Sequence, residues 1–261
     1  MSIISINGKV GSGKDTVGKF IQYLMWKDRV ERGIERKFHW TVEDFLEGKA
    51  VERASGWEIK KFATKLKQIA CMMLGCTMEQ LEDQEFKASP LPEEWQTKFP
   101  IDEIKTYRWF LQTLGTESTR EMIHGDFWIN GLFADYKGKE WEEQGVYRES
   151  KWIITDLRFP NELRAIKIHR GITIRVNRKK EDKYYYNAEY LTLDQLRETI
   201  KGETGEYPLY EYCKNYLVAE HESEIALDKA TFDFVIDNNG TIEELIEKVR
   251  EILIEINIIN A

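Results

Sequence analysis

The sequence is poor in the features that mark secreted, membrane and zinc-binding proteins. Its 261 residues include only three cysteines, none in a C-x-x-C pair, which is typical of reduced thiols in the cytoplasm. No apolar run reaches the ~18–20 residues that span a membrane, and no signal-peptide pattern precedes the first apolar segment. The four histidines lie far apart and lack zinc-ligand spacing. These absences predict a cytoplasmic protein that has no membrane partner.

Prolines are also few, and basic charge does not dominate. Five prolines, with 42% hydrophobic and 12% aromatic residues, indicate a globular chain rather than a disordered one. The formal net charge of −8 and the pI of about 5.3 disfavour a protein that coats a nucleic-acid polymer. The length suits one domain, or one domain with an inserted subdomain, and is sufficient for a sizeable core.

The stretch "GKVGSGKDT", which begins at Gly8, lies between two predicted elements. The β-branched run 2–7 predicts a buried strand, and apolar residues at helical spacing from Asp15 onward predict a helix. A glycine loop in this position is typical of a phosphate-binding loop, where backbone N–H groups surround an anion at a helix N-terminus. Gly8, Gly13 and Lys14 satisfy the pattern G-x-x-x-x-G-K. The departure is Asp15, which stands where Ser or Thr normally follows the lysine.

Strands alternate with helices along most of the chain, which predicts a doubly wound α/β sheet of mostly parallel strands. In such sheets ligands bind beyond the carboxyl ends of the strands, so we expect the glycine loop, Asp156 and the turn 238–240 along one edge. The predicted strands are 2–7, 58–63, 152–155, 172–176 and 232–237. The predicted helices begin at Asp15 and Glu117 or span 64–75, 77–87, 107–114, 161–169, 192–200 and 242–256. Segment 88–100 is predicted as a loop, 137–151 as a surface turn and 181–220 as a cap or lid, and Met73 and Met122 are expected to be buried.

Five residues combine polar chemistry with a predicted position near that edge. Asp156 ends a predicted strand, where a carboxylate could hold Mg²⁺ through water or bind an acceptor; a helix N-cap is the alternative. Arg158 and Glu162 are spaced i, i+4, which fits either a site or a simple salt bridge. Arg108 and Gln112 share a predicted helix face, which suits a phosphate and a base edge or, alternatively, a solvated surface.

Several segments in order resemble the phage deoxynucleoside monophosphate kinase family, a branch of the P-loop nucleotide kinases. They are "GKVGSGKDT", "KFATKLKQIA", "RWFLQTLGTESTREMIHGDFW", "WIITDLRFPNEL" with "GITIRV", "HESE" and "FDFVIDNNGTIEEL". The resemblance implies a P-loop NTPase-type three-layer sandwich over residues 1–261. It also implies an acceptor-binding insertion at about 63–135 and a lid-like insertion at about 178–220.

That family phosphorylates deoxynucleoside 5′-monophosphates with ATP and Mg²⁺, so the resemblance implies small-molecule nucleotide substrates. It implies a host-cytoplasm location and makes a homodimer a fair expectation. The implied ATP-binding residues are Gly11, Ser12, Gly13, Lys14, Asp15, Thr16 and Asn238. The implied substrate-binding residues are Leu66, Lys67, Lys87, Arg108, Gln112, Gly115, Thr116, Trp128, Asp156, Arg158 and Glu162. The implied catalytic residues are Lys14, Asp15, Arg108, Asp156 and Arg158, with Asp15 and Thr16 toward the metal and Arg120 as a further candidate cation. For Trp128, a core position is the alternative.

The sequence also departs from the family pattern. The basic residue expected near Val10 is one position earlier, at Lys9, which puts its contact with substrate in doubt. Segment 28–56 is extra, and we expect it to reshape the acceptor pocket. Thr16 cannot simply replace the missing hydroxyl, because one residue is ~100° around a helix. Our hypothesis is that Asp15 holds Mg²⁺ through water or orients the acceptor phosphate; simple stabilisation of the helix N-terminus is the alternative.

Two other functions fit the same sequence features. The first is a P-loop kinase that acts on another small phosphorylated acceptor, such as dephospho-coenzyme A. The second is a nucleotide-binding module without transfer activity. Acceptor screening separates the two kinase readings, and a binding module would hold ATP without acceptor-dependent ADP release.

Overall fold

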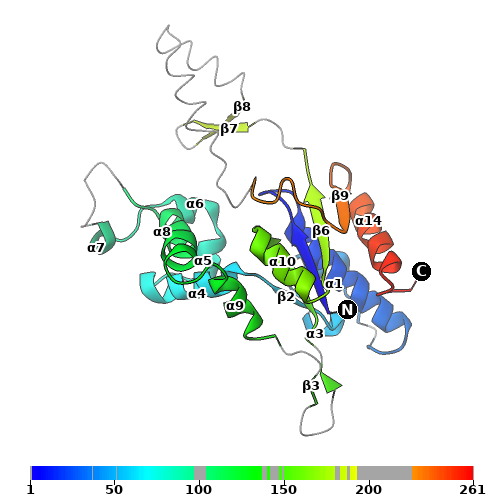
Figure 1. Cartoon of the computed structure of the whole chain (residues 1–261). Helices are drawn as coiled ribbons and strands as arrows, with labels where there is room; N and C mark the ends of the chain where they lie inside the picture. The colour runs from blue at the N-terminus through cyan, green and yellow to red at the C-terminus, as the bar shows by residue number, and fades with distance from the viewer. Residues whose placement is uncertain are drawn as a thin grey trace.

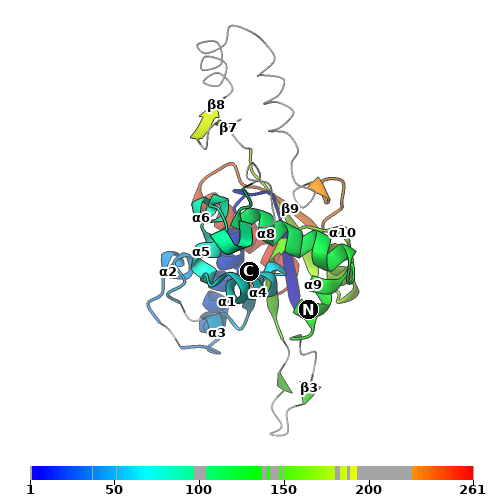
Figure 2. The same cartoon turned by 90° about the vertical axis from the view of Figure 1, so that its left-hand side faces the viewer.

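The computed structural model describes residues 2–36, 38–50, 52–96, 104–136, 140–141, 147–148, 150–179, 183–186, 189–192 and 225–260. Its centre is a five-stranded sheet in the order β2-β5-β1-β6-β9, in which every neighbouring pair is parallel. The strands are β1 (Ile3–Asn7), β2 (Glu58–Lys60), β5 (Trp152–Leu157), β6 (Ile172–Asn177) and β9 (Phe234–Asp237). Figures 1 and 2 show β1 at the middle of this sheet. Because β5 and β6 lie on opposite sides of β1, the carboxyl end of β1 is a topological switch point of the sheet. The glycine loop begins at this point.

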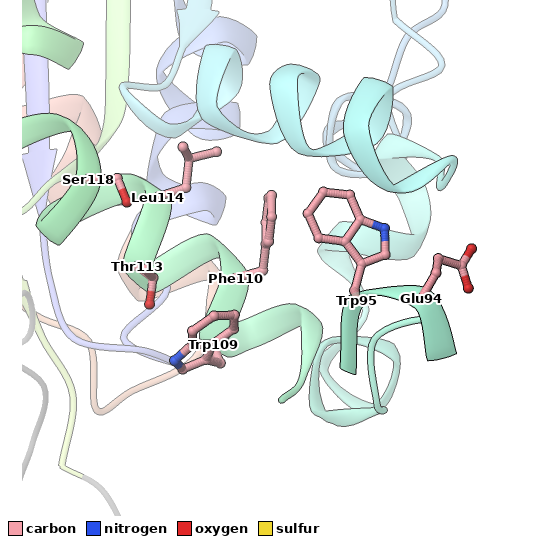
Figure 3. A pocket seen from close by; sticks show the side chains of 7 residues that line it. All are labelled: Glu94, Trp95, Trp109, Phe110, Thr113, Leu114 and Ser118. Carbon is pink, nitrogen blue, oxygen red and sulfur yellow. The ribbon is translucent and has the colours of Figure 1, made fainter. Parts of the chain in front are cut away.

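A group of helices forms a lobe beside the β2 edge of the sheet (Figure 1). It contains α4 (Ala63–Leu74), α5 (Met78–Glu82), α6 (Gln84–Ala88), α7 (Glu93–Gln96), α8 (Tyr107–Thr113) and the π-helix η1 (Leu114–Glu121). The lobe has a core of its own, made by Ala70, Leu74, Leu81, Leu91 and Tyr107. A separate cavity in the lobe is lined by Glu94, Trp95, Trp109, Phe110, Thr113, Leu114 and Ser118 (Figure 3).

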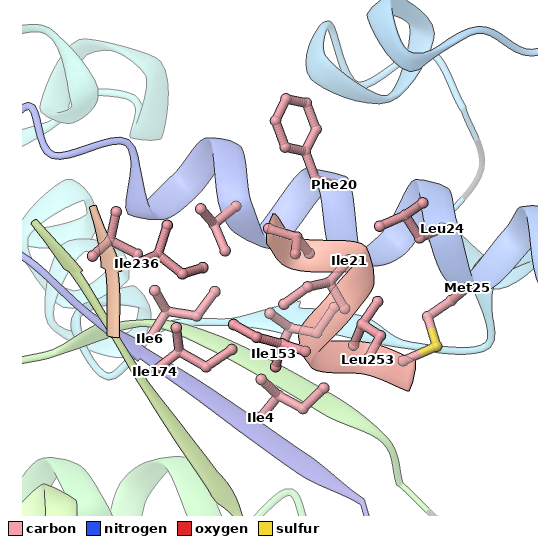
Figure 4. Packing of buried hydrophobic residues seen from close by; sticks show 14 of the residues in the cluster. Ile4, Ile6, Phe20, Ile21, Leu24, Met25, Ile153, Ile174, Ile236 and Leu253 are labelled. Carbon is pink, nitrogen blue, oxygen red and sulfur yellow. The ribbon is translucent and has the colours of Figure 1, made fainter. Parts of the chain in front are cut away.

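Helices cover both faces of the sheet. On one face, α1 (Lys14–Glu31) and α14 (Ile242–Glu255) pack on strand residues such as Ile4 and Ile153 (Figure 4). On the other, α10 (Pro160–Ile168) and α9 (Phe127–Phe133) pack on the neighbouring residues, for example Ile154. Successive side chains alternate between the faces of a strand, and both sets are fully buried. Each buried isoleucine contributes about 1.5–3 kcal/mol. The predicted α/β sandwich of three layers is confirmed.

The structure corrects the expected elements of the lobe in three places. Segment 88–100, predicted as a loop, contains the short helix α7 (Glu93–Gln96). The run 77–87 forms two short helices, because the Asp83 carboxylate accepts a hydrogen bond from the Phe86 N–H (2.6 Å) and starts α6 there. Gly115 does not break the next helix, since α8 continues directly into η1. Two side chains expected in the core lie outside it: Met73 is 55% exposed and Met122 is 82% exposed.

Three further expectations concern segments around the sheet. Residues 137–151, predicted as a turn, contain the short antiparallel strands β3 (Glu140–Trp141) and β4 (Tyr147–Arg148). Within 181–220, the structure describes the antiparallel pair β7 (Lys183–Tyr186) and β8 (Glu189–Thr192). The predicted helix 192–200, beyond its first residue, and the "HESE" segment lie outside the described residues. None of the helices in the described part of the chain is long and apolar enough to cross a membrane.

The extra segment 28–56 packs at the far end of α1. It contains α2 (Val42–Leu46) and α3 (Glu52–Ser55), and its Phe45 packs with Trp26 in a small aromatic cluster of its own. The glycine loop is at the N-terminal end of the same helix. An 18-residue helix is about 27 Å long, so the segment stabilises α1 at a distance from the loop.

Candidate functional site

The loop between β1 and α1 has the backbone that close approach to an anion requires. Gly11 and Gly13 adopt φ values of 77° and 93°, a left-handed conformation that favours glycine. Gly8 allows close packing, because a Cβ there would lie 2.7 Å from the Val176 carbonyl oxygen. α1 follows at Lys14, so its first N–H groups point toward the space at the loop.

Contacts inside the loop hold this shape. The Ser12 N–H donates to the Lys9 carbonyl (3.1 Å), and the Asn238 amide nitrogen donates to the Ser12 carbonyl (2.9 Å). Asn238, in the turn after β9, therefore stabilises the conformation of the loop. The ammonium of Lys9 pairs with Asp228 (3.6 Å), and Lys9 does not line the cavity described next.

A cavity of about 530 Å³ lies between this loop and the helical lobe. All of the residues predicted to bind the monophosphate line it: Leu66, Lys67, Lys87, Arg108, Gln112, Gly115, Thr116, Trp128, Asp156, Arg158 and Glu162. The predicted ATP-binding residues Gly11, Lys14 and Asp15 line it as well, whereas Ser12, Gly13, Thr16 and Asn238 do not. None of the described residues of segment 28–56 lines the cavity, so they do not support the expectation that this segment reshapes the acceptor pocket.

Asp15 makes two contacts through one carboxylate oxygen. Oδ1 lies 2.8 Å from the Lys61 ammonium and accepts a hydrogen bond from the Thr155 hydroxyl (2.9 Å). Gly18, one turn later in α1, permits this approach, since a Cβ there would lie 2.6 Å from the Thr155 methyl carbon. Partial burial would raise the pKa of Asp15, but the hydrogen bond and charge of Lys61, with the Thr155 hydroxyl, outweigh it and lower that pKa. Asp15 is thus an ionised carboxylate at the helix N-terminus.

Asp156 is held by backbone groups of another element. Its two carboxylate oxygens accept hydrogen bonds from the N–H groups of Phe62 (2.8 Å) and Ala63 (2.9 Å), at the start of α4. It therefore caps α4, rather than the helix that follows it in the sequence. Burial raises the pKa of Asp156, and these two N–H donors and the charge of Arg158 oppose that rise.

Four cations line the same cavity as the loop residues. The charges of Lys67, Arg108 and Arg158 all act on Lys87, and burial followed by these like charges lowers the pKa of Lys87. Two of the cations also contact the lobe itself: Lys67 pairs with Glu82 (2.5 Å), and Arg108 donates to the Gln84 side chain (3.0 Å). So many positive charges in one place favour an anion.

Arg120, which the sequence supported only weakly, is central to the wall of the cavity. Its guanidinium pairs with Glu162 (2.6 Å), donates to the Gly115 carbonyl (3.2 Å) and lies over the Phe159 ring (4.1 Å). The other Glu162 oxygen accepts from the Arg158 N–H (2.8 Å) and caps α10. Burial raises the pKa of Glu162, and the Arg120 charge opposes it. The carboxylate of Glu162 is thus tied to Arg120 and to backbone groups.

Trp128 is a core residue as well as a lining residue. Its side chain is 4% exposed, and its indole N–H donates to the Gly115 carbonyl (2.9 Å). The π-helical turn presents that carbonyl to Arg120 at the same time. Most of Trp128 therefore belongs to the core, as the alternative prediction stated.

The described residues around the loop include few side chains that could ligate a metal ion. No group of three or more His, Cys, Asp or Glu side chains that could hold a metal ion is found in the described part of the chain. Asp15 is a carboxylate beside Lys14, and its two contacts both fall on Oδ1. Because Mg²⁺ is usually bound by one or two carboxylates together with substrate phosphates and waters, Asp15 fits Mg²⁺ only when a nucleotide supplies the other ligands.

Sequence reasoning missed Lys61 and Thr155, which complete the surroundings of Asp15. Lys61 lies inside the predicted strand 58–63, whereas the observed β2 ends at Lys60 and leaves Lys61 at the edge where ligands bind. Thr155 lies in β5 and gave no signal of its own, because a threonine in a buried strand is common.

The sequence matches no protein-family model and no curated protein. Among solved structures it is similar to a dephospho-CoA kinase from Campylobacter jejuni, with 14% sequence identity over 97% of this chain and 96% of that chain. The TM-score of that comparison is 0.37.

Proposed function

We propose that this protein is a nucleotide kinase that transfers the γ-phosphoryl group of ATP to a deoxynucleoside 5′-monophosphate. The observation that carries the proposal is a pair of anion-binding features that face one cavity. One is the glycine loop with Lys14, and the other is the cation group of Lys67, Lys87, Arg108 and Arg158. A hydrolase needs only the first, whereas transfer between two phosphates needs both.

The residues that line the cavity would have different roles in the reaction, according to their positions. The loop N–H groups and Lys14 would hold the ATP phosphates. Lys87 and Arg108 would hold the acceptor phosphate, since two oxyanion charges would relieve the repulsion among the lobe cations. Phosphoryl transfer then depends on alignment and on stabilisation of charge in the transition state. When bound to the nucleotide, Mg²⁺ would neutralise phosphate charge, and Asp15 is the residue that would hold it.

The base and sugar would occupy the part of the cavity away from the loop. Gln112 offers an amide for a base edge, and Leu66 and Thr116 lie on the same wall. The deoxynucleotide assignment itself rests on the resemblance in the sequence.

Coupled ADP release with ATP and Mg²⁺ tests the proposal. The acceptor panel is dAMP, dGMP, dCMP, dTMP, 5-hydroxymethyl-dCMP, the ribonucleotides and dephospho-coenzyme A. We expect turnover with at least one deoxynucleotide, and a loss of about 100-fold or more in kcat/KM for Lys14→Ala and Arg108→Ala. A matched control is Lys105→Ala, since Lys105 precedes α8 and does not line the cavity.

Other outcomes point elsewhere. Turnover with dephospho-coenzyme A alone would assign the other kinase reading. ATP binding without release of ADP on any acceptor would contradict the proposal and favour a nucleotide-binding module.

A further inference from the structure

Lys61 lies in a turn that is fixed on both sides. β2 ends at Lys60, which pairs in register with Ile154 of β5. The next two backbone N–H groups after Lys61, those of Phe62 and Ala63, donate to Asp156. The backbone of Lys61 is therefore held between a sheet ladder and a buried carboxylate.

Its side chain crosses from this turn toward the glycine loop. The ammonium lies 2.8 Å from Asp15 Oδ1, and its side chain is 32% exposed on the cavity. The charge of Glu82, which pairs with Lys67 in the lobe, also acts on Lys61. Lys61 thus lies between Asp15 at the loop and the Glu82–Lys67 pair of the lobe, where the two phosphates of the proposed reaction would meet.

The ammonium has capacity left for a ligand. A lysine has three N–H donors, and Asp15 accepts one of them. Burial alone would lower the pKa of Lys61, but its hydrogen bond and charge interaction with Asp15 raise it, so the side chain stays protonated.

We infer that Lys61 is a further catalytic residue, whose ammonium contacts the phosphoryl group in transfer, and that Asp15 and Asp156 are its positioning residues. The inference rests on the proposed function. Negative charge moves between the two phosphates during transfer, and a fixed cation at the midpoint stabilises that charge without reorganisation. Asp15 fixes the ammonium and Asp156 fixes the backbone that carries it.

Steady-state kinetics of Lys61→Met, Lys61→Arg, Asp15→Asn and the double variant Asp15→Asn/Lys61→Met test the inference. We expect Lys61→Met to lower kcat about 100-fold, with the KM for ATP changed less than about threefold. Lys61→Arg keeps the charge and should recover about tenfold of the loss. Lys60→Met is the matched control: Lys60 is the neighbouring lysine, it pairs with Glu58 (2.8 Å), and it does not line the cavity.

The double variant separates direct contact from an effect through Asp15. If Lys61 touches the phosphoryl group, adding Lys61→Met to Asp15→Asn should lower kcat by about another tenfold or more. A double variant equal to Asp15→Asn, with Lys61→Met alone costing less than Asp15→Asn alone, would overturn the catalytic role, because Lys61 would then act only by orienting Asp15. Wild-type kcat in Lys61→Met would overturn it as well.

A binding measurement keeps the two proposals apart. If the wild type turns over no acceptor, the proposed function fails, and calorimetric titration with inorganic pyrophosphate then decides whether Lys61 contacts phosphate. A weakening of about tenfold or more in Lys61→Met, with Lys60→Met unchanged, would uphold the phosphate contact, and equal affinities would overturn it. Lys61→Arg gives the same comparison if the methionine variant does not fold.

Discussion

Replacing Arg120 by methionine should leave a buried carboxylate without its charged partner. Glu162 is 1% exposed, and the Arg120 side chain is 13% exposed. Removing one partner of a buried ion pair typically costs about 3–5 kcal/mol. Because Glu162 keeps its backbone hydrogen bonds, we expect the lower end, about 3 kcal/mol. For a chain of this size that lowers Tm by roughly 6–12 °C.

The loss should also depend on pH. Burial raises the pKa of Glu162 and Arg120 opposes this, so the pKa rises further in Arg120→Met. When the folded-state pKa of a carboxyl is raised, the folded protein binds more protons at this group than the unfolded chain does. The difference begins near pH 4.3, where a glutamate titrates in the unfolded chain. Stability then falls as pH rises through the window up to the folded-state pKa. The variant should therefore be less destabilised at pH 5 than at pH 8.

Urea unfolding of the wild type and Arg120→Met at pH 5, 6.5 and 8 measures both effects. The control is Glu162→Gln in the Arg120→Met background, which removes the charge and should recover part of the free energy of unfolding and abolish the extra pH dependence. A loss below about 1 kcal/mol at pH 8, or a loss that is the same at pH 5 and pH 8, would refute the reasoning.

Three further changes have defined expected outcomes. Gly8→Ala places a Cβ 2.7 Å from the Val176 carbonyl oxygen, so ATP affinity measured by calorimetry should fall at least about tenfold, with a lower Tm. Trp128→Phe removes the hydrogen bond to the Gly115 carbonyl and should cost about 1 kcal/mol in urea unfolding, while a change below a few tenths would show that the bond is dispensable. The lowered pKa of Lys87 predicts that the KM for the acceptor rises with pH below the usual titration range of lysine, and Lys87→Arg should shift that rise to higher pH.

The sheet could be predicted closely because its strands carry strong local signals. Trp152–Leu157 is an apolar run between charged segments, and it is buried along most of its length. The end of α4 at Gly75 could also be predicted from the local sequence, because the C-cap has a φ of 66°, which favours glycine. The edge rule for parallel sheets then placed the loop and Asp156 together, and the family resemblance supplied the lobe residues that share their cavity. The roles of these residues remain predictions.

The sequence did not predict the contacts between residues that are far apart in the chain. Asp156 contacts the N–H groups of Phe62 and Ala63, more than 90 positions earlier in the chain. No spacing rule reveals such a pair, because it depends on β2 and β5 lying side by side. The same adjacency brings Lys61 to Asp15. A lysine-rich turn after a weak strand gave no reason by itself to prefer Lys61 over Lys60.

Gly115 shows how tertiary contacts outweigh local propensity in this site. A glycine inside a helix costs about 1 kcal/mol relative to alanine, which is why the sequence predicted a break there. In the structure its carbonyl accepts hydrogen bonds from Trp128 and from the Arg120 guanidinium, and bonds from charged donors are worth about 1.5–3 kcal/mol each. A Cβ at this position would lie 3.0 Å from a Leu66 methyl carbon, so the missing side chain also lets α4 pack closely. The π-helical turn is therefore held by the cavity wall, and its shape should change with Arg120 rather than with the helix propensity of its own residues.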